Sequence, residues 1–177
     1  MNSYTKPSLY WTLLEHEDWR LIAAATEKGL CYVGSDGKGY DELHNWAAKK
    51  FPGSELIRDE KRLLLYTDEL TKYLSGKLKQ FKQQCHLQGT SFQQEVWHAL
   101  SSIPYGETRS YSDIANTLNK PSAVRAVGTA IGANPVLITV PCHRVIGKSG
   151  ALTGYRGGLA MKEKLLQLEV QSSVWEG

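Results

Sequence analysis

The residue pattern changes at Leu87–Ser91, and this change constrains the fold more than any other feature of the sequence. Before it, runs of aromatic and β-branched residues indicate several strands, and two segments show helical spacing. After it, helix start signals recur and strand signals are few. The sequence therefore predicts a small α/β domain over residues 1–88 and a mainly helical domain over 89–177, and the chain is long enough for both.

The first half shows strands followed by two helices. Strands are predicted for YWTLLE, RLIAAAT and LCYVGS, with a hairpin turn at Glu27–Gly29. Apolar residues at helical spacing predict helices over Tyr40–Lys50 and Glu60–Ser75, the second of which ends at the C-cap residue Gly76. The segment LKQFKQQCHL (78–87) is a further strand candidate. None of these elements carries an evident chemical motif.

The second half opens with three helix start signals. Ser91 with Gln94 and Ser110 with Asp113 each fit a capping box, and Ser122 is a candidate cap for a third helix, AVRAVGTAIGAN. Two short helices joined by a tight turn predict a helix-turn-helix, with a packed helical hairpin as the alternative. Beyond them, VLITV is predicted as a buried strand, GKSGALTGYRGG as a Gly-rich hairpin that forms a wing or lid, and LAMKEKLLQLE as an amphipathic helix.

The third helix consists mostly of small residues. Only Arg125 and Thr129 have side chains that can reach a base edge, fewer than sequence reading in a major groove needs. Small residues let a helix backbone lie against phosphates or a narrow groove, with Arg125 as a wedge in the base stack. A close helix–helix contact inside the domain is the alternative. Residues 105–156 hold six basic against two acidic side chains, which favours binding to DNA without regard to sequence.

The segment VPCHRVIG places Cys142 and His143 side by side after a proline that restricts the backbone. It is compatible with a catalytic thiol and its base, with half of a metal site, or with an inert buried thiol beside a surface imidazole. His143 and Arg144 favour the reactive thiolate form of Cys142. Neighbouring side chains of an extended chain point apart, so proton exchange requires a sharp turn or a bridging water, and Glu169 is a candidate to orient the imidazole.

The cysteine count and the apolar pattern limit the remaining possibilities. Three cysteines at wide spacing argue against a disulfide framework and favour a reducing compartment. No CxxC motif is present, and no second Cys/His pair lies at zinc-ligand spacing, so no metal is predicted. The sequence has no apolar run of the roughly 18 residues that a membrane span needs. It also shows no secretion signal, so we expect an intracellular protein without membrane association.

Four segments together resemble one family. YSDIA, AVRAVGTAIGANP, NPVLITVPCHRVIG and GALTGYRGGLAMKEKLL resemble, in order and spacing, the O6-alkylguanine-DNA alkyltransferases, also called methylated-DNA–protein-cysteine methyltransferases, over Ser91 to Glu169. The resemblance implies an α/β (α+β) two-domain fold, with a small ribonuclease-H-like N-terminal domain and a mainly helical C-terminal domain bearing a winged helix-turn-helix. It also implies DNA repair by direct reversal. The alkyl group of O6-alkylguanine, and of O4-alkylthymine, would move irreversibly to Cys142 in a single turnover with base flipping.

The resemblance further implies roles for individual residues. Cys142 resembles the alkyl acceptor, and His143, acting through a water and backed by Glu169, resembles its base. Asn134 matches the hinge asparagine of the family. The implied substrate contacts are Tyr111 as donor to N3 of the extruded guanine, the backbones of Cys142 and Val145 at its amino group, and Tyr155 with the amide of Arg156 near O6.

Contacts with DNA are expected from Ala123, Arg125, Ala126, Gly128, Thr129 and Lys148, with Arg125 filling the gap in the base stack. Arg156 departs from the family pattern, in which a small residue is expected. Its side chain is expected to change either the mobility of the lid or the alkyl groups that fit. The zinc ligands that some members carry near their start have no counterpart here, and no cofactor is implied.

The expected partner is double-stranded DNA carrying O6-alkylguanine, bound by a monomer. The expected location is the cytoplasm, in association with the nucleoid, or the nucleus if the source is a eukaryote. Three alternatives stay open. One is a cysteine hydrolase using Cys142, His143 and Glu169, and another is a non-catalytic DNA-binding module that flags lesions. The third is a response regulator fused to this domain, although the cysteine-rich metal domain that would accompany it is missing.

Overall fold

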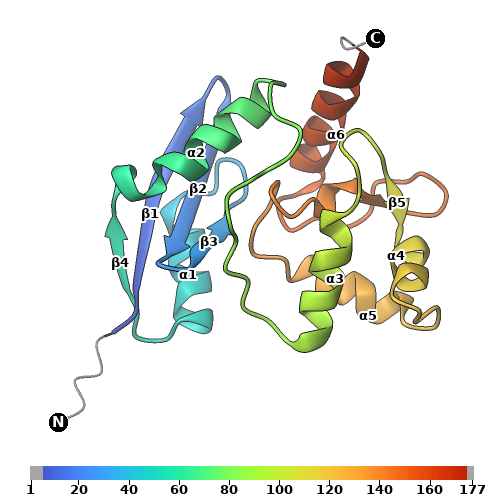
Figure 1. Ribbon diagram of the computed structural model, residues 1–177, viewed down its shortest axis with the longest axis horizontal. Helices are drawn as coiled ribbons and strands as arrows, with labels where there is room; N and C mark the ends of the chain where they lie inside the picture. The colour runs from blue at the N-terminus through green and yellow to red at the C-terminus, as the bar shows by residue number, and fades with distance from the viewer. Residues whose placement is uncertain (1–5, 175–177) are drawn as a thin grey trace.

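The computed structural model describes residues 6–174 as two halves that lie side by side (Figure 1). The sheet half contains β1 (Ser8–His16), β2 (Trp19–Thr26), β3 (Gly29–Val33), α1 (Tyr40–Lys50), β4 (Glu55–Arg58) and α2 (Glu60–Leu74). Its strands lie in the order β3-β2-β1-β4, antiparallel except for β4, which is parallel to β1. The predicted hairpin turn and the bounds of α1 are confirmed, whereas β4 was not predicted.

The strand β2 is buried on both of its faces. Leu21, Ala23 and Ala25 belong to a core that includes α2 and reaches into the second half of the chain. The alternate residues Ile22 and Ala24 belong to a separate core on the side of α1. A strand covered on both faces needs no polar alternation, which explains the continuous apolar run in this segment.

The helical half follows residues 75–90, which run between the two halves in Figure 1. Its elements are α3 (Ser91–Ser101), β5 (Arg109–Ser110), α4 (Tyr111–Thr117), α5 (Val124–Gly132), the 3₁₀ turn η1 (Cys142–Arg144), β6 (Val145–Ile146) and α6 (Leu159–Val174). The helices α4 and α5 form the helix-turn-helix, and α3 packs against both. The strands β5 and β6 pair in parallel beside it.

The capping residues differ in part from those predicted. The box at Ser110 and Asp113 is present as expected. The first helix is capped by Thr90 with Gln93, one residue earlier than predicted, because threonine supplies the same hydroxyl acceptor as serine. The prediction for Ser122 is wrong, since α5 begins after Ala123 without a side-chain cap.

Two predicted strands are irregular segments instead. Residues 78–87 form a loop that reaches the edge of β3 only near Cys85, and the Glu69 carboxylate accepts hydrogen bonds from the backbone N–H groups of Lys82 and Gln83 at 2.8 and 3.0 Å. Residues 136–140 form a buried turn in which Ile138 has a φ of 72°. Their apolar character reflects burial, which periodicity alone cannot assign to a strand. Likewise, residues 147–158 form a loop rather than a regular hairpin.

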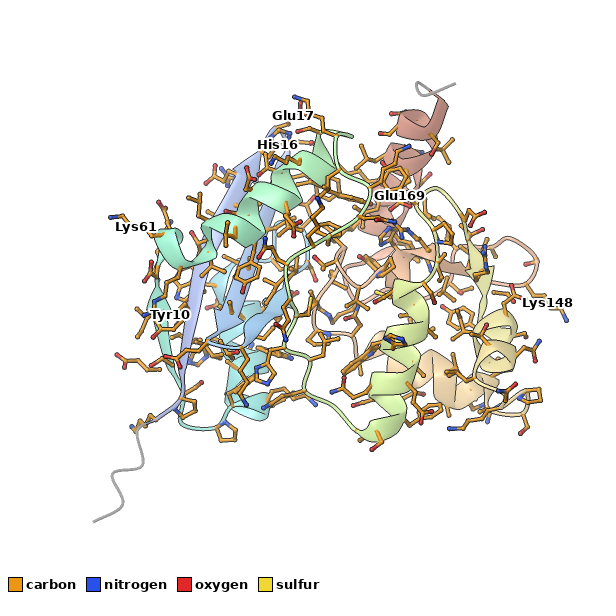
Figure 2. The ribbon with its side chains drawn as sticks, in the orientation of Figure 1. Tyr10, His16, Glu17, Lys61, Lys148 and Glu169 are labelled. Atoms are coloured by element: carbon orange, nitrogen blue, oxygen red, sulfur yellow. The ribbon has the colours of Figure 1, made fainter. Side chains whose placement is uncertain are left out.

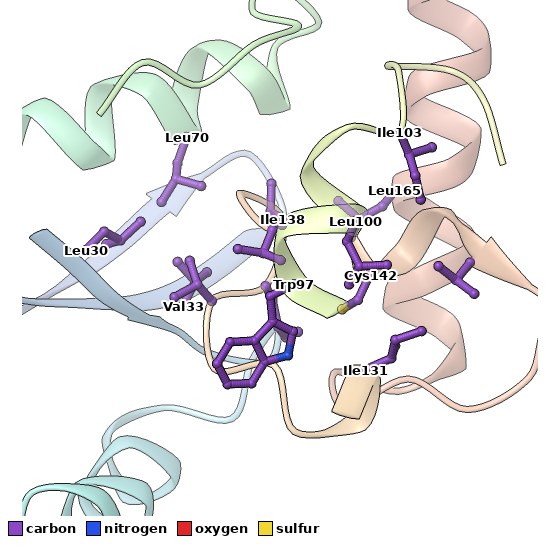
Figure 3. Close-up of a cluster of buried hydrophobic side chains, with 14 of the residues drawn as sticks. Leu30, Val33, Leu70, Trp97, Leu100, Ile103, Ile131, Ile138, Cys142 and Leu165 are labelled. Atoms are coloured by element: carbon purple, nitrogen blue, oxygen red, sulfur yellow. The ribbon is translucent and has the colours of Figure 1, made fainter. Parts of the chain in front are cut away.

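One hydrophobic core joins the two halves. Figure 3 shows Leu30, Val33 and Leu70 of the sheet half in the same cluster as Trp97 and Cys142 of the helical half. The indole N–H of Trp97 donates to the carbonyl of residue 130, 2.9 Å away, and so fixes α3 against α5. Cys142 therefore belongs to a core to which both halves contribute. Within residues 6–174, no helix is both long and apolar enough to cross a membrane.

Candidate active site

Cys142 begins a 3₁₀ turn rather than continuing an extended segment. This is the sharp turn that the adjacent Cys142 and His143 require if they are to act together. The Cys142 side chain is buried, and its Sγ lies 3.2 Å from Nδ2 of Asn134, which donates to it. The turn thus places the sulfur at a defined position beside a hydrogen-bond donor.

Asn134 braces the backbone that leads to the sulfur. Its side chain is completely buried. Besides the contact with Cys142, Nδ2 donates to the carbonyl of Val140 at 3.0 Å, and Oδ1 accepts from the N–H of Val136 at 2.9 Å. One side chain therefore holds both ends of the buried turn 136–140 and the sulfur of Cys142, which suits the hinge position that the resemblance implies for it.

A pocket of about 240 Å³ opens onto Cys142 between α4, α5 and the loop 147–158. Its lining residues are Tyr111, Gly128, Ile131, Gly132, Cys142, Gly154, Tyr155 and Arg156. The Tyr111 hydroxyl donates to the carbonyl of Thr153 at 3.2 Å, which ties the start of α4 to the loop. Gly128 and Gly132 of α5 have no side chains, and they leave space in the pocket that larger residues would fill. Val145 is buried outside this lining, and its carbonyl accepts a hydrogen bond from Lys162 at 2.6 Å.

A buried carboxylate organises the groups behind the sulfur. Glu169 of α6 accepts from Nε2 of His143 at 2.6 Å, and both side chains are essentially inaccessible to solvent. Arg144 donates through Nε to Oε1 at 2.8 Å and through Nη2 to Oε2 at 3.1 Å. Figure 2 places Glu169 between α6 and the sheet half. Both oxygens of the carboxylate therefore accept charge-assisted hydrogen bonds.

The protonation states of this cluster follow from burial and hydrogen bonding. Burial alone raises the pKa of Glu169, but the hydrogen bonds and charges of His143 and Arg144 lower it to about 2. Burial lowers the pKa of His143 despite the neighbouring carboxylate, so the imidazole is neutral near pH 7. Because Glu169 is an anionic acceptor, Nε2 of His143 carries the proton and Nδ1 is the basic nitrogen.

The resting state of Cys142 differs from the sequence-based expectation. Burial raises the pKa of its thiol, and the hydrogen bond from Asn134 and the charges of Arg156 and Lys162 offset this effect only in part. Arg144, which was expected to favour the thiolate, is bound to Glu169 instead. The sulfur is therefore a thiol at rest, and a base must remove its proton before it can act as a nucleophile.

Among residues 6–174, Nδ1 of His143 is a buried nitrogen without a hydrogen-bond partner. It is the basic atom of the imidazole and adjoins the residue that bears the thiol. This geometry suits a general base that takes the proton of Cys142. The same described residues contain no cluster of three or more His, Cys, Asp or Glu side chains placed to hold a metal ion.

Two residues of the cluster were not identified from the sequence. The Tyr73 hydroxyl, from α2, donates to Oε2 of Glu169 at 2.5 Å. Lys162 of α6 is completely buried, and its Nζ donates to the carbonyls of Val145 and Thr153 at 2.6 and 2.8 Å. Helical spacing marks Tyr73 as a core residue and Lys162 as a charged residue of an amphipathic helix, so neither carried a signal of its contact with the site.

One face of α5 is open to solvent beside the pocket. Arg125, Ala126 and Thr129 are exposed along it, and Ala123 and Gly128 are partly exposed. The opposite face, including Ala130, is buried against α3, so small residues make the helix–helix contact that was predicted as the alternative, while the exposed face leaves the contact with DNA a prediction. Lys148 is exposed on the loop at the outer edge of the helical half (Figure 2).

Arg156 lines the pocket, but its guanidinium is bound outside it. Nε donates to the carbonyl of Asn134 at 2.9 Å, and Nη2 donates to the carbonyls of Val33 and Pro135 at 2.7 and 3.1 Å. Nη1 lies 3.2 Å from Oε1 of Glu42 on α1. Arg156 therefore ties the loop of the pocket to the sheet half and to the hinge. Of the two effects expected for its side chain, this geometry supports an influence on the loop rather than direct selection of alkyl groups.

The fold and the site define a class of protein: a helix-turn-helix protein that carries a buried thiol at a pocket beside the exposed face of its second helix, α5. Residues 91–171 match the DNA binding domain, and residues 9–85 the ribonuclease-like domain, of 6-O-methylguanine DNA methyltransferase. The chain belongs to this family, as the resemblance indicated.

Individual relatives agree with this assignment along nearly the whole chain. The inducible methylated-DNA–protein-cysteine methyltransferase of Bacillus subtilis is 61% identical over 168 residues, which cover 95% of this chain and 94% of that protein. The crystal structure of Mycobacterium tuberculosis O6-methylguanine methyltransferase is 39% identical and superposes with a TM-score of 0.80, covering 93% of this chain and 94% of that one. The M. tuberculosis protein in complex with DNA superposes with a TM-score of 0.78 over the same shares of the two chains, also at 39% identity.

The carboxylate of Glu169 is expected to make stability depend on pH. Its folded pKa of about 2 lies below the unfolded value, so its contribution is complete above about pH 4.3 and is lost as the pH falls towards 2. The lowered pKa of His143 acts in the same direction at somewhat higher pH. Between pH 7 and 3, the free energy of unfolding measured in urea should fall by about 1–2 kcal/mol less in Glu169→Gln than in the wild type. Glu163→Gln, exposed on the same helix, is the control, and equal slopes for all three proteins would contradict this assignment.

Removal of the Arg156 guanidinium is expected to destabilise the junction of the two halves. Arg156→Ala leaves the buried carbonyl of Asn134 without this donor and breaks the ion pair with Glu42, so the free energy of unfolding should fall by about 2–3 kcal/mol. Arg20→Ala, which breaks an exposed pair with Glu15, should cost less than about 1 kcal/mol. Equal losses for the two variants in urea unfolding would show that Arg156 is dispensable for the junction.

Proposed function

We propose that Cys142 is the residue that accepts the alkyl group in the repair reaction of this protein. The protein repairs DNA by direct reversal, transferring an alkyl group from DNA to one of its own cysteines, as the names of its relatives indicate. The observation that supports Cys142 is its position in the pocket lining, beside the recognition helix and next to the neutral His143. Cys31 and Cys85 do not line this pocket.

In the proposed reaction, Cys142 loses its thiol proton before it takes the alkyl group. His143, through Nδ1 and a bridging water, takes the thiol proton of Cys142. The resulting thiolate attacks the alkyl carbon on O6 of guanine, so that an S–C bond forms and the C–O6 bond breaks with its electron pair passing to the purine. Tyr111 donates a hydrogen bond at N3 to the developing charge. The product is a thioether, which water does not hydrolyse, so the protein acts once.

We propose that further residues hold the substrate. The backbones of Cys142 and Val145 take the guanine amino group, and Tyr155 with the amide of Arg156 lines the space near O6. Val145 lies outside the pocket lining, so this contact uses the second lone pair of its carbonyl, beside the one that accepts from Lys162. Asn134 keeps the acceptor turn in place through its three hydrogen bonds. The pocket has room for a base that has left the stack, so we propose that the damaged base is flipped out of the duplex. We also propose O4-alkylthymine as a second substrate.

The partner of the protein is DNA, and we propose that it is duplex DNA carrying O6-alkylguanine, bound by a monomer. The exposed face of α5, made of Ala123, Arg125, Ala126, Gly128 and Thr129, lies against the backbone, with Lys148 as a further phosphate contact. Arg125 occupies the space left by the flipped base.

The proposed location is the site of the chromosomal DNA: the cytoplasm with the nucleoid, or the nucleus of a eukaryote. We also propose residues 1–88 and 89–177 as the two domains. The family matches support this division, since they end at 85 and begin at 91.

The identity of the acceptor can be tested by tracing the alkyl group. After incubation with duplex DNA carrying labelled O6-methylguanine, mass spectrometry should find at most one methyl group per protein, on Cys142. Cys142→Ala should bind the DNA and transfer nothing, while Cys85→Ala, at a cysteine outside the pocket, should transfer normally. Label on Cys31 or Cys85, or more than one transfer per protein, would be incompatible with the proposal.

The role of Arg125 can be separated from general affinity. Arg125→Ala should slow repair in duplex DNA by about 10- to 100-fold, because the unstacked site is no longer filled. The same variant should react with free O6-benzylguanine within about twofold of the wild type, since no base has to be extruded. The matched control is Lys148→Ala, whose defect should disappear at low salt because it removes only a phosphate contact. Equal losses on both substrates, or full rescue of Arg125→Ala by low salt, would exclude the wedge role.

A further inference from the structure

We propose that Tyr73, on α2 of the sheet half, is a positioning residue for alkyl transfer: its hydroxyl controls how strongly Glu169 holds His143. The inference rests on the proposed function, in which His143 is the base for Cys142. It gives the sheet half, which carries no motif of its own, a part in positioning the base.

The geometry places three donors on one carboxylate oxygen. Oε2 of Glu169 accepts from the Tyr73 hydroxyl at 2.5 Å, from Nε2 of His143 at 2.6 Å and from Nη2 of Arg144 at 3.1 Å. The other oxygen, Oε1, accepts from Nε of Arg144 at 2.8 Å and from the N–H of Gly106 at 3.0 Å. The Tyr73 hydroxyl also lies 3.4 Å from Nε2 of His143, so the two donors are neighbours on the same acceptor.

The hydroxyl of Tyr73 does more than complete the packing of the core. The ring is fully buried and contacts Phe81, Tyr105 and His143 at centroid distances of 5.5, 5.9 and 6.4 Å. A phenylalanine would occupy this space equally well. The phenol remains protonated, because burial and the charge of Glu169 raise its pKa well above 10. It is therefore a permanent donor to the carboxylate.

The number of donors that share Oε2 of Glu169 affects the pKa of His143. Each hydrogen bond that Oε2 accepts withdraws negative charge from that oxygen and weakens its attraction for a proton on His143. The other ionisable groups near the imidazole are Arg144 in η1, Lys162 on α6, Tyr105 in the loop after α3, and the thiol of Cys142. These groups stay in place when only the Tyr73 hydroxyl is removed. His143 should then become more basic, and its protonation should begin at a higher pH.

The test is the pH dependence of single-turnover methyl transfer to Cys142, with the protein saturated by duplex DNA carrying O6-methylguanine. In Tyr73→Phe the acidic limb of the profile should move to higher pH. The rate at the acidic end should fall about tenfold, the effect of one lost hydrogen bond to a charged group, while the alkaline plateau is kept or raised. Tyr66→Phe, on the same helix and packed against the same core, should leave the profile unchanged. Thermal melting of both variants checks that they are folded.

Two results would overturn the role of Tyr73. A profile that superposes on the wild type would show that the hydroxyl does not influence the base. A rate lowered by the same factor at every pH would show that the hydroxyl serves only the structure. Failure of the proposed function is distinguishable from both, because the wild-type protein would then transfer no methyl group to Cys142 at any pH.

Discussion

The structure depends on one buried carboxylate. Glu169 accepts five hydrogen bonds, from α2, from η1 and from the loop after α3, and it is itself held on α6. An isolated charge at this depth would be strongly unfavourable, and the five donors offset the cost of burying the anion. Because the donors come from both halves, the carboxylate joins them where the thiol turn begins. Structure and reactivity therefore rely on the same interaction.

Burial sets the protonation state of the thiol, and the Glu169 anion sets the tautomer of the imidazole next to it. Burial keeps Cys142 protonated at rest, so it is protected from oxidation and from unrelated electrophiles. His143, the base that we propose for this thiol, is neutral, with its proton fixed on the nitrogen that faces Glu169. Asn134 and Arg156 hold the surrounding backbone, so the sulfur does not depend on a mobile segment for its position. A protein that reacts once is suited to a nucleophile that stays inactive until a substrate fills the pocket.

Much of the fold and part of the site could be predicted from the sequence, for physical reasons that differ by element. The helix over Tyr40–Lys50 was found because its amphipathic spacing is local. Residues 136–140 were mistaken for a strand, because an apolar run records burial and not backbone geometry. Asn134, Cys142 and His143 are close in sequence, and their resemblance to a family placed them together. Tyr73 and Lys162 were missed because their contacts arise only when α2 and α6 pack around η1.

The central claim is that burial keeps the His143 imidazole neutral and that the Glu169 anion fixes its proton on Nε2. The most direct measurement is ¹⁵N NMR of the histidine side chains near pH 7, with His143 assigned by comparison with His143→Gln. The His143 signals should be those of a neutral ring with the proton on Nε2 and a free Nδ1, and they should change in Glu169→Gln. An imidazolium signal, or a neutral ring protonated on Nδ1, would contradict the claim, since neither form has a free Nδ1 to accept the proton of the thiol.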